Sequence, residues 1–168
     1  MTKKFELVAE LTKEFFGRKL FRIRAVVSFG DVSEGDLGGW VEKENNLDQS
    51  GNAWVSGNAW VSGDARVSGN ARVSGNARVS GNAWVSGNAW VSGNAHWITI
   101  GPIGSENGFL TAFRQKDNSI VVSRGCFSGT IDEFESAVKE RHGDSKHAQI
   151  YLALIPVIKL RLDEVSDE

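Results

Sequence analysis

Eight residues with the chemistry of a binding surface recur at intervals of six. They are Trp54, Trp60, Arg66, Arg72, Arg78, Trp84, Trp90 and His96. A guanidinium beside an indole ring makes a cation–π contact worth about 0.5 to 2 kcal/mol, and arginine also neutralises phosphate. This set is therefore our group of candidate interface or ligand residues.

A six-residue repeat, Gly-Asn-Ala-x-Val-Ser, must position these side chains. Its period is neither that of a helix nor the simple alternation of a strand. We expect a short extended piece at each Val and a corner at each Gly-Asn, because Gly adopts positive φ freely and Asn tolerates it. The valines are Val55, Val61, Val67, Val73, Val79, Val85 and Val91, and the alanines are Ala53, Ala59, Ala65, Ala71, Ala77, Ala83, Ala89 and Ala95.

The pattern Val-Ser-Gly-Asn-Ala-x resembles the hexapeptide repeat of left-handed parallel β-helices, over residues 51–95. In that family three hexapeptides make one triangular coil, with the aliphatic residue inside and the small residue at an inner corner. The resemblance implies that residues 18 apart lie above one another, about 4.8 Å apart as neighbouring strands.

The residue before each inward Val points outward, because successive side chains of a strand alternate. The 18-residue register then predicts three ladders: Trp54, Arg72 and Trp90; Trp60, Arg78 and His96; Arg66 and Trp84. Two interpretations stay open. The ladders only stabilise the stacked coils, or the rings, which can each bury about 150 to 250 Å², meet a partner, most simply another copy of the chain.

Residues 1–30 predict a hairpin, with a turn at residues 15–19, that caps the open N-terminal end of the solenoid. Such a cap protects unpaired strand edges. We assign residues 31–96 to the solenoid, with an irregular first coil that runs through residues 30–41. Residues 42–49 are polar and predict a loop whose carboxylates form a solvated edge.

Residues 97–168 are expected to form a separate α+β module. Together with the hairpin and the β-helix, this module gives a fold class that is mainly β. Strands are expected at residues 97–100, 109–114 and 120–123. Thr130 and Glu133 form a capping-box pattern that opens a helix ending near His142-Gly143. A second helix begins near residues 144–145, and Pro156 predicts a kink or a break in it.

Two passages resemble uncharacterised phage and prophage proteins. One is Gly-Asp-Leu-Gly-Gly-Trp-Val at residues 35–41, running into the repeats, and the other covers residues 105–114 and 124–135. This resemblance implies a phage origin. It also implies a partner in the host, as for an anti-CRISPR-like inhibitor or a protein that sequesters a nucleotide signal.

Hexapeptide proteins include acyltransferases that use acetyl-CoA and a histidine base. His96 is the only histidine among the repeats, but no extended loop interrupts them to shape an acceptor site. Acyl transfer therefore stays an alternative to binding. A second alternative is a nucleotide or nucleic-acid binder that uses the Arg and Trp faces, with binding lost when Arg66, Arg72 and Arg78 are replaced.

Other chemistry is weaker in the sequence. Arg124 and Thr130 are a candidate anion site at a helix N-terminus, although two acidic residues follow directly. Cys126 is expected to be a small buried residue rather than a nucleophile. His142, Asp144 and His147 lack a fourth metal ligand, so we expect no metal and no cofactor.

Composition narrows the class of protein further. The 168 residues carry a net charge of −2, and Arg66, Arg72 and Arg78 fall on three faces, which disfavours a simple phosphate groove. One cysteine, no signal region and no long apolar run indicate a cytoplasmic protein without a membrane partner. We therefore expect a non-catalytic binding protein that forms a homo-oligomer, a trimer by analogy with hexapeptide proteins.

Overall fold

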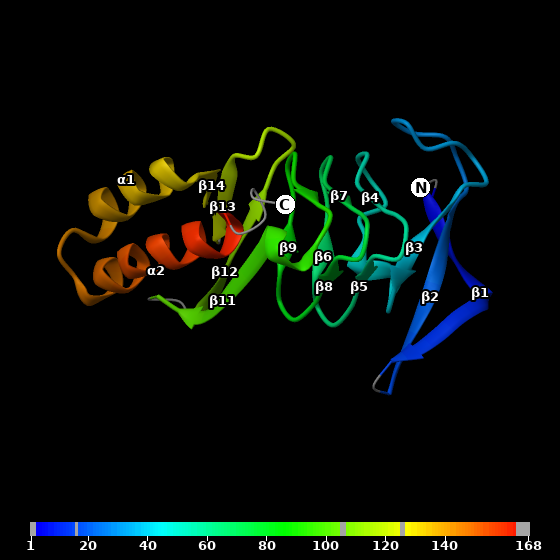
Figure 1. The fold of residues 1–168 in the computed structure, drawn as a ribbon, viewed down its shortest axis with the longest axis horizontal. Coiled ribbons are helices and arrows are strands. Elements are labelled where there is room, and N and C mark those ends of the chain that lie inside the picture. The colour runs from blue at the N-terminus through cyan, green and yellow to red at the C-terminus, as the bar shows by residue number, and fades with distance from the viewer. Residues whose placement is uncertain (1–2, 16, 105–106, 125–126, 164–168) are drawn as a thin grey trace. The chain divides into compact units, whose positions relative to one another are not determined.

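A computed structural model describes residues 3–15, 17–104, 107–124 and 127–163. The chain divides into two compact units, Met1–Asn94 and Ala95–Glu168. The first contains the hairpin and the repeats, and the second contains a sheet and two helices (Figure 1).

The repeats form a β-solenoid with three stacks of short parallel strands. Trp54 pairs with Arg72 and Arg72 with Trp90, Trp60 pairs with Arg78, and Arg66 pairs with Trp84. These pairs confirm the predicted register of 18 residues. The strands are β4 (Trp54–Val55), β5 (Trp60–Val61), β6 (Arg66–Val67), β7 (Arg72–Val73), β8 (Arg78–Val79), β9 (Trp84–Val85) and β10 (Trp90–Val91).

The interior of the solenoid is lined by the repeat valines and alanines, as predicted. Val55 to Val91 at every sixth position are fully buried, and Ala53 to Ala89 are at most 1% exposed. The corner glycines from Gly51 to Gly87 take φ between 60° and 73°, where a side chain would be strained. None of the repeat asparagines among the described residues has positive φ, so glycine alone provides the left-handed conformation.

Outside the strand ladders, the backbone hydrogen bonds between coils run in one direction. The N–H of Trp54 donates to the carbonyl of Ala71, and that of Ser56 donates to Val73, with the same pattern in later repeats. At these positions each coil gives its N–H groups to the next coil. The N-terminal end of the solenoid therefore presents carbonyl oxygens there, and a cap must supply donors to them.

The predicted loop at residues 42–49 is wrong, because this segment is a side of the first coil. It contains the short helix η1 (Glu44–Asn46), and Leu47 is 1% exposed and bridges to Val67 in parallel. Val41 and Leu47 are six positions apart, as the valines are, but Leu47 and Val55 are eight positions apart. Because of the two extra residues at this corner and the polar side chains around them, the six-residue pattern is not recognisable in this segment.

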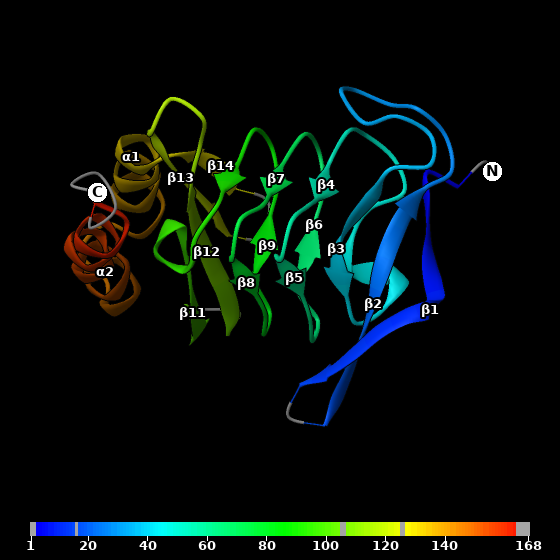
Figure 2. The same cartoon turned by 45° about the vertical axis from the view of Figure 1, so that its right-hand side comes forward.

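The N-terminal hairpin is longer than its sequence pattern indicated. Strands β1 (Phe5–Phe15) and β2 (Arg18–Ala25) pair in antiparallel, and β2 pairs with β3 (Leu37–Val41). Because β3 pairs in parallel with β5, the hairpin continues one sheet of the solenoid, in the order β1-β2-β3-β5-β8. Figure 2 shows β1 and β2 beyond β3 at the end of the stack.

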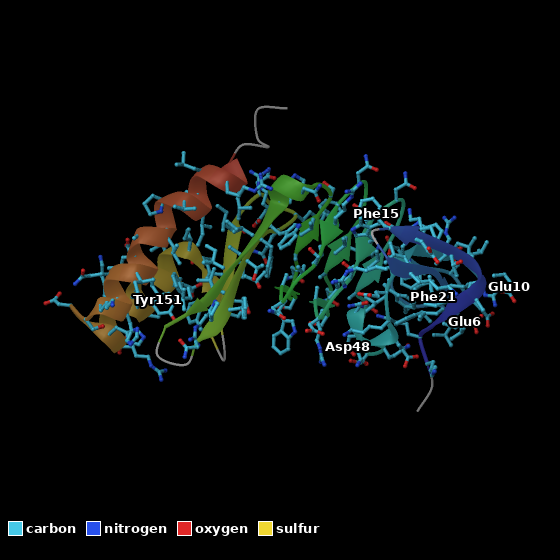
Figure 3. All side chains as sticks on the ribbon, turned by 90° about the horizontal axis from the view of Figure 1, so that it is seen from below. Glu6, Glu10, Phe15, Phe21, Asp48 and Tyr151 are labelled. Atoms are coloured by element: carbon cyan, nitrogen blue, oxygen red, sulfur yellow. The ribbon has the colours of Figure 1, made fainter. Side chains whose placement is uncertain are left out.

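The second unit is a four-stranded antiparallel sheet with two helices. The sheet has the order β11 (Trp97–Ile103), β12 (Gly108–Arg114), β13 (Ile120–Arg124), β14 (Phe127–Thr130), and the helices are α1 (Ile131–His142) and α2 (Lys146–Asp163). Leu110, Val122 and Tyr151 belong to its core, and Figure 3 shows Tyr151 on the helical side of this unit.

The capping box of α1 is confirmed. The side chain of Thr130 accepts from the Glu133 N–H, and the Glu133 side chain accepts from the Thr130 N–H. The sequence did not indicate the strand β14, and Pro156 lies inside α2 without breaking it. No helix in the described ranges is long and apolar enough to cross a membrane.

Candidate binding surface of the solenoid

The outward residues form the predicted ladders, with two differences. Arg78 lies 4.4 Å from the Trp60 ring centroid and Arg66 lies 5.9 Å from that of Trp84, so both make cation–π contacts. Arg72 is in register with Trp54 and Trp90, but its guanidinium pairs with Asp31 and lowers the pKa of that carboxyl.

His96 does not continue the Trp60–Arg78 ladder as a strand residue. It ends the short helix η2 (Asn94–His96), because the six-residue pattern stops there, and Asn94 turns its side-chain oxygen to accept from the Arg78 N–H at 2.8 Å. The expected stack of Trp60, Arg78 and His96 is therefore replaced by Trp40, Trp60 and Arg78, since Trp40 pairs with Trp60 in parallel.

The four ladder tryptophans divide into two pairs with different surroundings. Trp54 is 4% and Trp60 is 9% exposed, whereas Trp84 is 52% and Trp90 is 45% exposed. The N-terminal region covers the first pair: Phe29 lies 5.3 Å from Trp54, and Phe15 lies 4.6 Å from Trp60, measured between ring centroids. Trp84 and Trp90, on two different sides of the coil, keep about half of their surface accessible to solvent.

Lys13, Arg22 and Arg78 lie close to the rings of Trp40 and Trp60, which are paired on neighbouring strands. Lys13 Nζ lies 4.3 Å from the Trp40 ring and 5.5 Å from the Trp60 ring, and the Arg22 guanidinium lies 5.7 Å from Trp40. Burial lowers the pKa of Lys13, and the charges of Arg22 and Arg78 lower it further. The positive charges therefore repel one another here.

The surface of the solenoid unit has hollows. The hairpin pocket, of about 540 Å³, is lined by residues that include Phe15, Arg18, Trp60, Asp64, Arg78 and Asn82. In Figure 3, Phe15 is labelled where the hairpin meets the solenoid. A second hollow of about 360 Å³ lies on the side of Arg66 and Trp84, beside Glu44 and Asp48.

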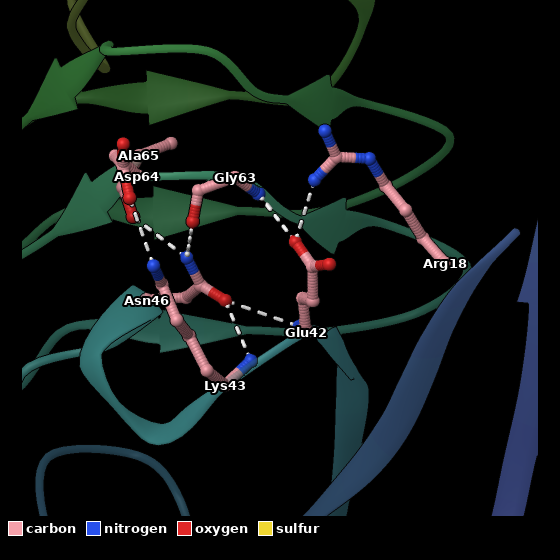
Figure 4. A network of polar contacts seen from close by, with 7 residues as sticks. All are labelled: Arg18, Glu42, Lys43, Asn46, Gly63, Asp64 and Ala65. Carbon is pink, nitrogen blue, oxygen red and sulfur yellow. Dashed lines mark hydrogen bonds and ion pairs between the residues drawn. The ribbon is translucent and has the colours of Figure 1, made fainter.

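A polar network joins the hairpin, the first coil and the second coil (Figure 4). Arg18 pairs with Glu42 at 2.8 Å, and the same carboxylate oxygen accepts from the Gly63 N–H at 2.7 Å. Lys43 pairs with Asp64 at 2.9 Å and lowers the pKa of that carboxyl. The carboxylates near the hairpin pocket are thus each bound to a cation of their own.

Asn46 is the fully buried centre of this network. Its side-chain oxygen accepts from the N–H groups of Glu42 and Lys43, and its amide nitrogen donates to the carbonyls of Gly63 and Ala65. All four hydrogen-bonding positions of the amide are used, so its burial costs little. Sequence reasoning missed this residue, although Asn46 precedes Leu47 in the position that Trp or Arg takes before Val.

Lys4 is a second functional residue that the sequence did not reveal. It is 4% exposed, and its ammonium donates to the carbonyls of Ala53 at 2.8 Å, Gly51 at 3.4 Å and Ser50 at 3.5 Å. Gln49 fixes the adjoining backbone, because its side-chain oxygen accepts from the N–H groups of Lys4 and Phe5. Lys4 therefore supplies donors to the carbonyl end of the solenoid.

The other predicted sites lie in the second unit. Arg124 and Thr130 stand at opposite ends of the β13–β14 pairing, where Arg124 faces Phe127 and Thr130 faces Val121. Arg124 donates to the Ile103 carbonyl and lies 5.8 Å from the Tyr151 ring, so the fold does not bring it to the start of α1. Instead, Glu133 occupies the backbone donor of Thr130.

His142 and His147 of this unit lie close to each other, and His142 also lies close to Tyr151. His142 and His147 lie 5.9 Å apart between ring centroids, and His142 is equally far from Tyr151. Within the described ranges, no group of three His, Cys, Asp or Glu side chains is placed to hold a metal ion. Cys126 lies outside the described residues.

Comparison with known proteins supports a β-solenoid. A family model described as YdcK Beta solenoid repeat matches four overlapping stretches, residues 59–75, 65–81, 71–87 and 77–93. No curated protein matches the chain. The matched stretches coincide with the coils that stack in register, so the chain contains a β-solenoid repeat region similar to that family.

Proposed function

We propose that this chain is a non-catalytic binding protein that assembles with copies of itself through Trp84 and Trp90. The observation that carries the proposal is the unequal burial of four tryptophans at one repeat position. The chain covers Trp54 and Trp60 with its own aromatic residues, but about half of the surface of Trp84 and Trp90 is exposed. Exposed indole rings on neighbouring sides of a rigid column favour a protein interface.

A second copy is the occupant that best fits this surface. Its net charge of −2 opposes self-association only weakly, and the Arg66 guanidinium beside Trp84 offers a cation to a carboxylate of the partner. Homo-oligomers are the commonest assemblies of soluble proteins, and tryptophan and arginine are enriched at the centres of interfaces. The hexapeptide resemblance favours a trimer.

We further propose that the solenoid is left-handed. The 18-residue register, the buried valines and the glycine corners support this, since they match the hexapeptide pattern. The sense of the coil in an experimental electron-density map tests it, and a right-handed coil would contradict the resemblance.

The phage resemblance extends the proposal to a host defence protein as an additional partner. Acyl transfer, the alternative, gains no support from the position of His96 in η2 rather than in a strand ladder. A direct check is acetyl-CoA binding by the unmodified protein and by His96→Ala, where loss in the variant would favour the enzyme.

Self-association is tested by measuring the mass of the particle by sedimentation equilibrium. We expect the unmodified chain to form an oligomer and Trp84→Ser/Trp90→Ser to dissociate at least about tenfold more readily, because two half-exposed indoles leave the interface. Leu37→Ser is the matched control, since Leu37 is 45% exposed on β3, away from both rings in sequence register. An unmodified protein that stays monomeric at about 100 µM would contradict the proposal.

A further inference from the structure

The hairpin pocket combines apolar rings with positive charge in a way that self-association does not explain. Phe15 and Trp60 supply two aromatic rings, and Arg18 and Arg78 supply two guanidinium groups. A volume of about 540 Å³ falls in the range of small-molecule sites. We propose that this pocket binds a nucleoside polyphosphate, with its phosphates between Arg18 and Arg78.

Arg78 is the residue best prepared to bind phosphate. Its guanidinium lies over the rings of Phe15 at 5.0 Å and Trp60 at 4.4 Å, and these contacts hold the group in place. Within the described part of the chain, its guanidinium makes no ion pair or hydrogen bond with a carboxylate. The edge of a stacked guanidinium that carries its N–H donors suits bidentate binding of phosphate oxygens.

Arg18 lies on the pocket wall and already binds an anion. It pairs with Glu42 at 2.8 Å, and both groups belong to the exposed network of Figure 4. Glu42 keeps a second donor, the Gly63 N–H, when Arg18 turns to a ligand. Arg18 can therefore exchange its carboxylate for a phosphate without leaving Glu42 alone.

The electrostatic surroundings favour an anion with several charges. Lys13 and Arg22 lie along the same row of rings, and the neighbouring charges of Arg22 and Arg78 contribute to the lowered pKa of Lys13. Asp64, an acidic residue that lines the pocket, is bound to Lys43. A polyphosphate bound at Arg78 reduces the repulsion among these cations, because it brings compensating negative charge.

The organic part of the ligand is assigned from the aromatic lining. The ring of Phe15 is half-buried at the end of β1 and lines the pocket, so a flat nucleobase can pack against it. Trp60 is only 9% exposed and already contacts Phe15 and Arg78, so it forms the floor. The preferred ligand thus carries both a base and phosphates.

Calorimetric titration of the full chain tests this site. The probes are ATP, inorganic tripolyphosphate, adenosine and a ten-residue oligothymidylate. We expect saturable binding of ATP, weaker binding of tripolyphosphate and none of adenosine. Arg78→Gln should weaken ATP binding at least about tenfold and Arg78→Lys by less, because lysine keeps the charge but loses the planar fork.

Arg72→Gln is the charge-matched control. Arg72 occupies the same repeat position on another side of the coil and pairs with Asp31, so its loss should leave ATP binding within about twofold. Circular dichroism verifies that each variant is folded. The proposal fails if ATP does not bind, or if adenosine binds as tightly as ATP. It also fails if Arg78→Gln and Arg72→Gln weaken ATP binding equally.

Tighter binding of the oligothymidylate than of ATP would assign the site to nucleic acid and contradict the proposal of a nucleotide ligand. This inference does not rest on self-association, because Arg78 and the exposed indoles lie on different sheets. A titration reports ligand binding and sedimentation reports mass, so the two proposals can fail separately.

Discussion

At the scale of single residues, Lys4 shows how one ammonium group closes an end of the solenoid. The first coil has no preceding coil to give N–H groups to its carbonyls, and Lys4 Nζ donates to three of them. Its ammonium also lies 4.8 Å from the Phe29 ring. Burial lowers the pKa of Lys4 to about 8, with a smaller lowering by Arg72 and an opposing effect of Asp48.

This lowered pKa predicts a stability that rises with alkaline pH. The folded chain loses the Lys4 proton near pH 8, and the unfolded chain keeps it to about 10.5, so unfolding takes up a proton between these values. The free energy of unfolding of the unmodified chain, minus that of Lys4→Met, should therefore increase from pH 8 to 10.5. Below pH 8 this difference should stay constant. Urea unfolding at several pH values measures it, and a flat or falling difference in that window would refute the explanation.

At the scale of elements, the first coil depends on a close approach between backbones. Gly39 occupies the place of the repeat alanine on β3, and a Cβ there would lie 2.6 Å from the Ala59 carbonyl oxygen and 2.7 Å from a Val55 methyl. The pairing of β3 with β5 therefore needs glycine at this point, although the later coils accept alanine at theirs.

Replacement of Gly39 by alanine should destabilise the solenoid unit by about 1 to 3 kcal/mol, because backbone atoms cannot move aside cheaply. Gly93→Ala is the matched control: an added Cβ at Gly93 meets no atom within 4 Å. We expect its effect to stay within about 0.5 kcal/mol. Tryptophan fluorescence during urea unfolding measures both, and equal effects would show that the close approach is not what limits this position.

At the scale of the molecule, the hairpin protects the solenoid unit in three ways. Strand β2 pairs with the edge of β3, Lys4 binds the carbonyl end, and Phe15 covers Trp60. An unprotected parallel edge is a site for addition of further strands, so loss of the hairpin exposes both an edge and an apolar ring.

Deletion of residues 1–25 should therefore produce large particles in light scattering, together with a red shift of tryptophan emission. Phe15→Ser separates the two causes, because it exposes Trp60 and leaves the strand edge paired. We expect the red shift without the scattering in this variant. Scattering that is as strong in Phe15→Ser as in the deletion would show that the ring, rather than the edge, causes association.

The six-residue period by itself determined the lining of the solenoid, and the resemblance to hexapeptide proteins added the register of 18 residues. Each Val pairs with the Val 18 residues later, so identical repeats supply both partners of every contact. The structure of one repeat therefore predicts that of the others. The capping box of α1 was equally readable, because Thr130 and Glu133 lie within one turn. Local and periodic contacts leave their pattern in the sequence.

Only the tertiary structure decided which tryptophans are covered and which cations gather. Phe15 reaches Trp60, Lys4 reaches Ala53 and Arg18 reaches Glu42 across long stretches of chain, from segments without a repeat. Two extra residues before Val55 hid the first coil, and with it the buried amide of Asn46. Such contacts follow from the direction in which the hairpin leaves β3, a property of the folded chain and not of any residue pattern.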